Sequence, residues 1–198
     1  GYRFPSMAEL FVTTNVSGIE IFPNPELRSE KGWSSEIGIK QAIKIGEFKS
    51  FIDIAAFRMR YNDMMEFTFG QWGEPNFDDD GNISNFFGLG FKSVNVGKTE
   101  ISGIELSING EGKINEITKI NFLGGYTYMN PISLELNKTY ANDFYGNPIT
   151  YNNSSSDSTI LKYRYKNVAK ADIELIIDKF SVGSSVRYND FMSNIDYI

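Results

Sequence analysis

Residues 161 to 177 read LKYRYKNVAKADIELII, and apolar and polar side chains alternate through most of this stretch. Successive side chains of a β-strand point to opposite faces of the sheet. The pattern therefore predicts one strand with an apolar face and a polar, water-exposed face. This strand would be roughly three times as long as the usual globular strand of 5–6 residues. Its apolar set is Leu161, Tyr163, Tyr165, Asn167, Ala169, Ala171, Ile173, Leu175 and Ile177.

A second strand is expected after a tight turn. Asp178 and Lys179 predict the turn, and the two-residue alternation resumes over residues 180 to 190. Such a pattern is typical of a long antiparallel hairpin. We expect one apolar surface on it, made by Ile173, Leu175, Phe180 and Val182.

Four earlier segments alternate in the same way but less regularly, and short turns join them in pairs. They cover residues 33 to 45, 50 to 62, 100 to 108 and 117 to 129. Two isoleucines fall among the polar residues of the second segment. Its apolar face is expected to carry Phe51, Phe57, Met59 and Tyr61, and its polar face Arg58, Arg60 and Asn62 together with Ile52 and Ile54.

Two motifs near the start of the chain are more specific than this alternation. Residues 2 to 11 read YRFPSMAELF, and residues 24 to 38 read NPELRSEKGWSSEIG. In this order they resemble the signature of the TonB-dependent outer-membrane receptors, R-x-P-S-x-x-E-L followed by N-P-x-L-x-x-E and a strand ending in E-x-G. Ser29 stands where proline is frequent. The matching residues are Arg3, Pro5, Glu9, Asn24, Pro25, Glu30 and Glu36, for which the resemblance implies structural roles in the barrel wall and its extracellular rim.

The resemblance implies an all-β fold, an antiparallel meander of about seven strands from a 22-stranded transmembrane β-barrel. Residues 1–198 would be part of the barrel domain, with the plug domain and the terminal strands outside them. The implied function is energy-coupled import of a ferric siderophore, haem, cobalamin or a glycan. The implied partners are a TonB-type coupling protein, reached through an N-terminal region outside these residues, the plug, outer-membrane lipid and the small-molecule ligand.

Two long polar stretches, residues 68 to 87 and 133 to 159, separate the predicted hairpins. Compact soluble domains seldom keep such long loops without a function. Bacterial barrels have short periplasmic turns and long extracellular loops. We therefore expect residues 70 to 85 and 135 to 158 outside the cell and residues 178 and 179 at the periplasmic rim.

Composition excludes several other classes of protein. The chain has no histidine and no cysteine, so Ser-His and Cys-His catalysis cannot occur within it. A net charge of −6 argues against a nucleic-acid partner, because phosphates require a basic face. We expect no enzyme, no catalytic residue and no cofactor, although a glycosidase built on two carboxylates stays open. The run Asp78, Asp80 and Asn82 is a weak candidate for a cation site, but it lacks the glycine and glutamate of an EF-hand loop.

Seven basic residues need a wet environment, because a lipid-facing Lys or Arg at the bilayer midplane costs about 2–4 kcal/mol. We expect them to face the barrel lumen or its rim, where they would attract an anionic solute or pair with carboxylates. They are Arg58, Arg60, Lys162, Arg164, Lys166, Lys170 and Arg187.

Six aromatic residues sit toward one end of their strands on the apolar face. They predict an aromatic girdle at the membrane–water interface. The same residue types would suit the alternative function, a soluble all-β carbohydrate-binding module whose two apolar inner faces pack on each other. The residues are Trp33, Tyr126, Tyr128, Tyr163, Tyr165 and Tyr188.

Overall fold

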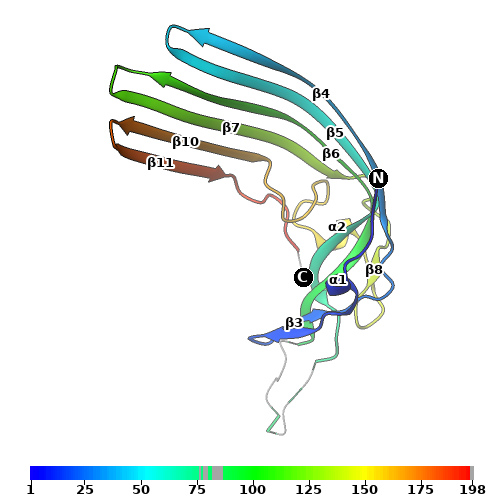
Figure 1. Ribbon diagram of the computed structural model, residues 1–198. Helices are drawn as coiled ribbons and strands as arrows, with labels where there is room; N and C mark the ends of the chain where they lie inside the picture. The colour runs from blue at the N-terminus through cyan, green and yellow to red at the C-terminus, as the bar shows by residue number, and fades with distance from the viewer. Residues whose placement is uncertain (76, 78–79, 82–86, 197–198) are drawn as a thin grey trace.

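The computed structural model describes residues 1–75, 77, 80–81 and 87–196. Six long strands follow one another in a single antiparallel sheet that curves strongly along their length (Figure 1). The sheet is open at both edges, and its long strands confirm the all-β prediction. The strands are β4 (Glu30–Ile45), β5 (Phe48–Gln71), β6 (Leu89–Lys113), β7 (Thr118–Ser133), β10 (Asn167–Ile177) and β11 (Phe180–Asn189).

Short elements gather at the other end of the sheet from the tight turns (Figure 1). β1 pairs with the start of β4, and β3 runs parallel to β6 at Glu20 to Phe22. The elements are β1 (Tyr2–Arg3), α1 (Met7–Phe11), β2 (Thr14–Val16), β3 (Ile19–Phe22), β8 (Ala141–Asn142), β9 (Pro148–Ile149) and α2 (Tyr151–Ser154).

The tight turn at Asp178 and Lys179 occurs where the sequence predicts it, whereas β6 continues to Lys113 and its turn into β7 lies further along the chain than the alternation indicates. Ile177 pairs with Phe180, so only Asp178 and Lys179 form the loop, and Asp178 has a positive φ of 52°. Positive φ in a two-residue loop matches the twist of the flanking strands. The register confirms the predicted hairpin, since Leu175 lies opposite Val182. Ile173, Leu175, Phe180 and Val182 therefore share one face, as expected.

The predicted strand over residues 161 to 177 is too long, because the sheet begins only at Asn167. Tyr163 has a φ of 57°, which turns the chain away from the extended conformation. The carboxylate of Asp190 accepts hydrogen bonds from the backbone N–H groups of Lys166 (3.0 Å) and Asn167 (2.9 Å). The strand thus starts where Asp190 holds it, and residues 161 to 166 run into the interior instead.

β5 and β6 continue well past their neighbours, so residues 68 to 71 of the predicted loop belong to β5 instead. They have 24 and 25 residues against 16 in β4. At a rise of about 3.3 Å per residue, each is about 80 Å long. The predicted loop over residues 133 to 159 holds β8, β9 and α2.

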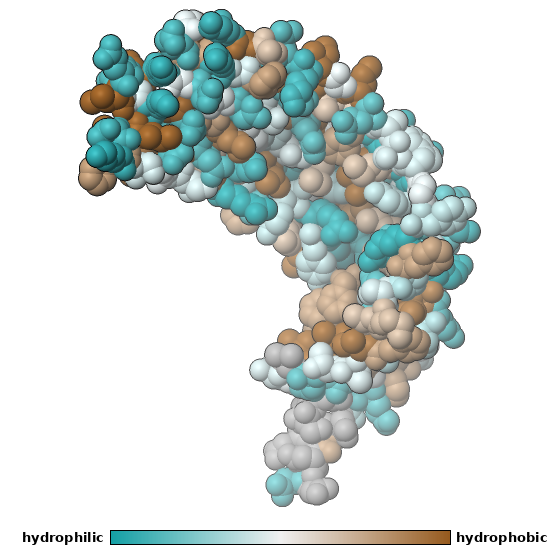
Figure 2. Space-filling view, viewed as in Figure 1, coloured by the Kyte–Doolittle hydropathy of each residue, from teal (hydrophilic) through white to brown (hydrophobic). Residues whose placement is uncertain are grey.

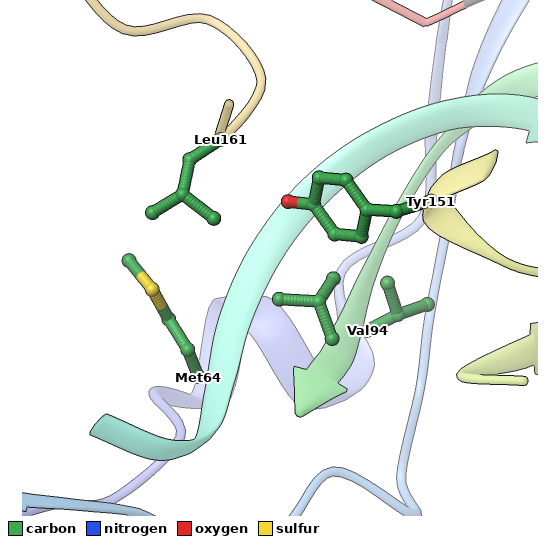
Figure 3. Packing of buried hydrophobic residues seen from close by; sticks show 5 residues of the cluster. Met64, Val94, Tyr151 and Leu161 are labelled. Carbon is green, nitrogen blue, oxygen red and sulfur yellow. The ribbon is translucent and has the colours of Figure 1, made fainter. Parts of the chain in front are cut away.

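A small hydrophobic core lies under these loops, where the extended part of β5 and β6 meets α2. Met64, Val94, Val96, Tyr151 and Leu161 are all buried there, and Figure 3 shows Leu161, Tyr151 and Met64 converging from separate segments. The strand register shifts on both sides of Met64. In the described part of the chain, no helix is long and apolar enough to span a membrane.

Candidate functional site

Strand pairing sorts the side chains of the sheet onto two faces, because residues paired directly across antiparallel strands share a face. We call the face with the isoleucine-rich rows the outer face. Large apolar side chains lie open to solvent on the strands (Figure 2). One such row crosses all six strands through Ile39, Ile54, Leu106, Tyr126, Ala169 and Tyr188.

The opposite face, here called the inner face, has two hollows lined in part by charged side chains. Near the turns a hollow of about 990 Å³ is lined by residues of all six long strands, among them Lys44, Phe51 and Asp172. Within it Asn121 donates a 3.0 Å hydrogen bond to Glu174. Because residues from all six strands line this one hollow, the sheet is concave on its inner face at this end.

A second hollow of about 500 Å³ on the inner face holds acids and bases on opposite sides. The acids come from β4, β5 and β6, and the bases come from β10 and β11. Lys170 and Arg187 are directly paired across the last two strands. The charged lining residues are Glu36, Asp53, Glu105, Lys170 and Arg187.

The seven basic residues do not share one wall, contrary to the sequence prediction. Arg58 pairs with Ser102, and Arg60 pairs with Glu100, which places both arginines on the outer face with Ile54. The predicted phase of β5 is therefore inverted. Large apolar side chains occupy both faces of this strand, so its own alternation cannot settle the phase, whereas pairing with β4 and β6 does.

Arg58 and Arg60 are held by a shared carboxylate on the outer face. Arg58 Nη2 lies 2.8 Å from Glu100 Oε2, and Arg60 Nε lies 3.8 Å from the same oxygen. Both arginine side chains stay about half exposed. The pair of guanidinium groups thus shares one counter-charge and retains open N–H donors.

Lys162 is buried and lies before the start of β10, so it does not line the inner face of the sheet. Its side chain is 1% exposed, and its Nζ lies 2.5 Å from Asp196 Oδ1, which is itself 3% exposed. The same Nζ also donates to Ser154 (2.9 Å) and Tyr140 (3.2 Å). A buried ammonium group needs such a full set of partners, since an unpaired one would be very costly to desolvate.

Asp196 also contacts two other segments of the chain. It accepts a hydrogen bond from the hydroxyl of Tyr163 (2.8 Å) and another from the backbone N–H of Phe69 (2.7 Å). Lys162 provides the third contact. The segment after β11 is therefore tied to the extended part of β5 and to the chain before β10.

Glu66 and Tyr151 form a second buried pair beside this ion pair. The hydroxyl of Tyr151 donates a short hydrogen bond to Glu66. The other carboxylate oxygen of Glu66 lies 3.8 Å from Arg164 Nη2 and has no hydrogen bond. Burial raises the pKa of Glu66 above its usual range, and the Tyr151 hydrogen bond and the charge of Arg164 only partly offset this. Burial together with Glu66 also raises the pKa of Tyr151.

The motif residues near the start of the chain form one connected clamp. Arg3 contacts Glu9 at 2.5 Å and Glu30 at 3.4 Å. Ser6 caps α1 in a reciprocal pair with Glu9. Glu30 in turn accepts a 2.5 Å hydrogen bond from the backbone N–H of Met65. These contacts agree with the structural roles that the family resemblance implies, and they hold the first strands against the irregular part of β5.

A further motif residue connects to the extended part of β6. The side chain of Asn24 donates a 2.8 Å hydrogen bond to the carbonyl of Ser93. Just beyond it, Asn95 accepts from the backbone N–H of Arg28 (2.8 Å). These two hydrogen bonds anchor residues 24 to 28, which precede β4, to β6.

Comparison with known proteins agrees with this geometry. The family model described as "TonB dependent receptor-like, beta-barrel" matches residues 1–197. The chain belongs to the TonB-dependent receptor family. Members of this family are receptors or transporters of the bacterial outer membrane.

One curated relative of this receptor chain is a "Hemoglobin and hemoglobin-haptoglobin-binding protein" from Haemophilus ducreyi (strain 35000HP / ATCC 700724). The two are 25% identical over 107 residues, which is 54% of this chain. The matched part spans 10% of the relative's length. The chain thus corresponds to a small share of a much longer receptor.

Four of the six predicted girdle residues lie on the outer face of the receptor sheet, and two do not. Trp33 pairs with Arg60 and Tyr128 with Ile104, while Tyr126 and Tyr188 belong to the row described above. Tyr163 and Tyr165 precede β10 and leave the sheet. The girdle prediction is wrong for these two, because the chain turns inward before the strand starts.

The cation-site candidate of this receptor lies largely outside the described residues, since Asp78 and Asn82 are not among them. Asp80 is described and exposed. Within the described ranges, no group of three or more acidic side chains is arranged to hold a metal ion. Glu66, Tyr151 and Asp196 are the site residues that the sequence did not point to, because nothing in their spacing shows that they meet.

Proposed function

We propose that this chain forms part of the barrel wall of an energised outer-membrane receptor that imports a scarce solute. The outer face is the observation that carries the proposal. On β4 it presents Trp33, Ile37, Ile39, Ile43 and Ile45 in one row. A strand segment from Trp33 to Ile45 is about 40 Å long, and a tilt of about 40° brings its height to about 30 Å, close to the apolar band of about 25 Å on barrels of this kind.

The concave inner face supplies the lumen in this proposal. Lys170 and Arg187 face Glu36, Asp53 and Glu105 there, so the wall offers both signs of charge to the plug and to a passing solute. The projecting ends of β5 and β6, with the loop over residues 134 to 166, form the extracellular part. This part includes Lys162, Arg164 and Lys166, which lie in the loop before β10 instead of lining the lumen.

The plug domain and the coupling region that would contact a TonB-type protein belong to parts of the receptor outside residues 1–198. The ligand class is a ferric siderophore, haem, cobalamin or a glycan. The name of the curated relative makes haemoglobin the first ligand to test. The chain has no histidine, so haem iron would have to be held by other residues or by other parts of the receptor.

The alternative, a soluble carbohydrate-binding sandwich, receives less support. Such a module would pack a second sheet on the apolar face. Within the described residues, several isoleucines of the outer face are exposed, with Ile37 at 78% and Ile39 at 73%. A soluble domain would leave this surface as an aggregation liability.

A growth experiment tests the proposed function with the full-length receptor. Deleting its gene, or the gene of the coupling protein, should abolish growth on one limiting nutrient supplied outside the cell. Haemoglobin, free haem, a ferric siderophore, cobalamin and a glycan are supplied in turn. Normal growth of the deletion strain on all of them, or full-length protein found only in the soluble fraction, would exclude the importer.

A further inference from the structure

A group of basic residues interrupts the apolar outer face of the sheet. Arg58 and Arg60 extend from β5, and Lys31 extends from β4 on the same side, diagonal to Arg60 because it pairs with Asn62. All three are exposed. Glu100 is the acid that pairs with the two arginines. The group therefore carries three positive charges against this one negative charge.

The basic group sits at the edge of the apolar band. Toward the turns, the next residues of β5 on the same face are Ala56 and Ile54. Trp33 pairs directly with Arg60, and its side chain is half exposed. Arginine on the lipid face costs about 2–4 kcal/mol at the midplane but only about 0–1 kcal/mol near the interface, where tryptophan also prefers to lie. These residues therefore mark the membrane surface on the loop side.

We propose that Arg58, Arg60 and Lys31 bind a phosphate group of a glycolipid of the outer leaflet, namely lipopolysaccharide. The assignment rests on the proposed function, because it takes the loop side of the barrel to face outward. Guanidinium groups bind phosphate oxygens through paired N–H donors, and Glu100 leaves most of these donors open.

The continuity of the surface favours a lipid over a free phosphate ion. Ile37 and Ile54 begin an apolar path directly below the basic group on the same face. Acyl chains attached to the phosphate-bearing sugars would lie along this path, while Trp33 and Tyr2 flank the sugars. Tyr2 pairs with Lys31, whose ammonium lies 6.0 Å from the tyrosine ring.

The test uses the full-length receptor purified from outer membranes in detergent. Wild type, R58Q/R60Q and E100Q are compared for bound lipopolysaccharide by native mass spectrometry. The added probes are lipopolysaccharide, its enzymatically dephosphorylated form, and inorganic phosphate. We expect at least tenfold less lipopolysaccharide on R58Q/R60Q, more on E100Q, and weak retention of the dephosphorylated form. K113Q/K119Q is the matched control, since these two lysines also pair across strands but lie at the turn end.

The outcomes separate this inference from the proposed function. Equal retention by wild type and R58Q/R60Q, or equal binding of the dephosphorylated lipid, overturns the inference while the receptor still reaches the outer membrane. Displacement of the lipid by millimolar inorganic phosphate would also overturn it, because the site would then recognise the free ion. The gain expected for E100Q cannot come from misfolding, and the outer-membrane fraction of each variant reports whether it has folded.

Discussion

Lys162 and Asp196 form a buried ion pair across 34 residues of sequence, with 2.5 Å between Nζ and Oδ1. The pair closes the loop before β10 against the segment after β11. Asp196 also holds the backbone of Phe69 in the projecting part of β5. Lys162, which the sequence predicted to line the lumen, therefore takes part in the contacts that hold the loops at this end of the sheet together.

The first prediction concerns this pair. K162M and D196N should each destabilise the loop side by about 3–5 kcal/mol, because removing one partner leaves the other buried without its counter-charge. The double variant K162M/D196N should lose less than the sum of the two. The loss is measured by thermal unfolding of the full-length receptor in detergent. Additive losses in this double-mutant cycle would show that the two groups act independently.

A second prediction follows from the buried carboxyl of Glu66, which lies outside the apolar band. Its pKa is raised in the folded state, so the folded chain holds the proton more tightly than the unfolded chain does. This contribution to stability is complete below the usual pKa of about 4.5 and is lost as the pH rises through the raised value.

The E66Q variant should weaken that pH dependence. Protease resistance of the loops in the wild type should fall as the pH is raised from 4.5 through the raised pKa of Glu66, and the fall should be smaller in E66Q. The Y151F variant removes the hydroxyl that binds Glu66, so it should raise the pKa of Glu66 further and extend the dependence to higher pH. An identical pH profile in wild type and E66Q would contradict the assignment.

A third prediction tests which face meets lipid. I54K places an ammonium on the outer face of β5, and D53K places one on the adjacent residue of the inner face. I54K should cost about 2–4 kcal/mol and reduce the amount of folded receptor in the outer membrane, whereas D53K should be tolerated. The readout is heat-modifiable migration of the receptor in gels. The reverse order would mean that the two faces are exchanged.

A fourth prediction tests the orientation of the sheet. The chain contains no cysteine, so single cysteines can be introduced as labels. T139C lies in the exposed loop after β7, and K179C lies in the tight turn at the other end. A membrane-impermeant maleimide added to intact cells should label T139C alone, and both sites after the outer membrane is opened. Labelling of K179C on intact cells would reverse the topology.

The sequence by itself determined the fold class, because a two-residue period is a local property of the chain. It also placed the turn at Asp178 and Lys179 and the phase of β10 and β11, where one face is clearly apolar. The motif around Arg3, Glu9 and Glu30 indicated the family, and the structure joins these residues in one clamp. Each of these features can be recognised from a short stretch of sequence, without knowing which distant segments come together.

Only the tertiary structure decided the phase of β5 and the role of Lys162. Both faces of β5 carry large apolar side chains, so the face that points inward depends on the register with β4 and β6, which are separate segments. Lys162 fits the alternation of a strand, but burial against Asp196 and Ser154 outweighs it. Such partners are brought together by loop closure over long sequence distances, and a local pattern does not record which segments will meet.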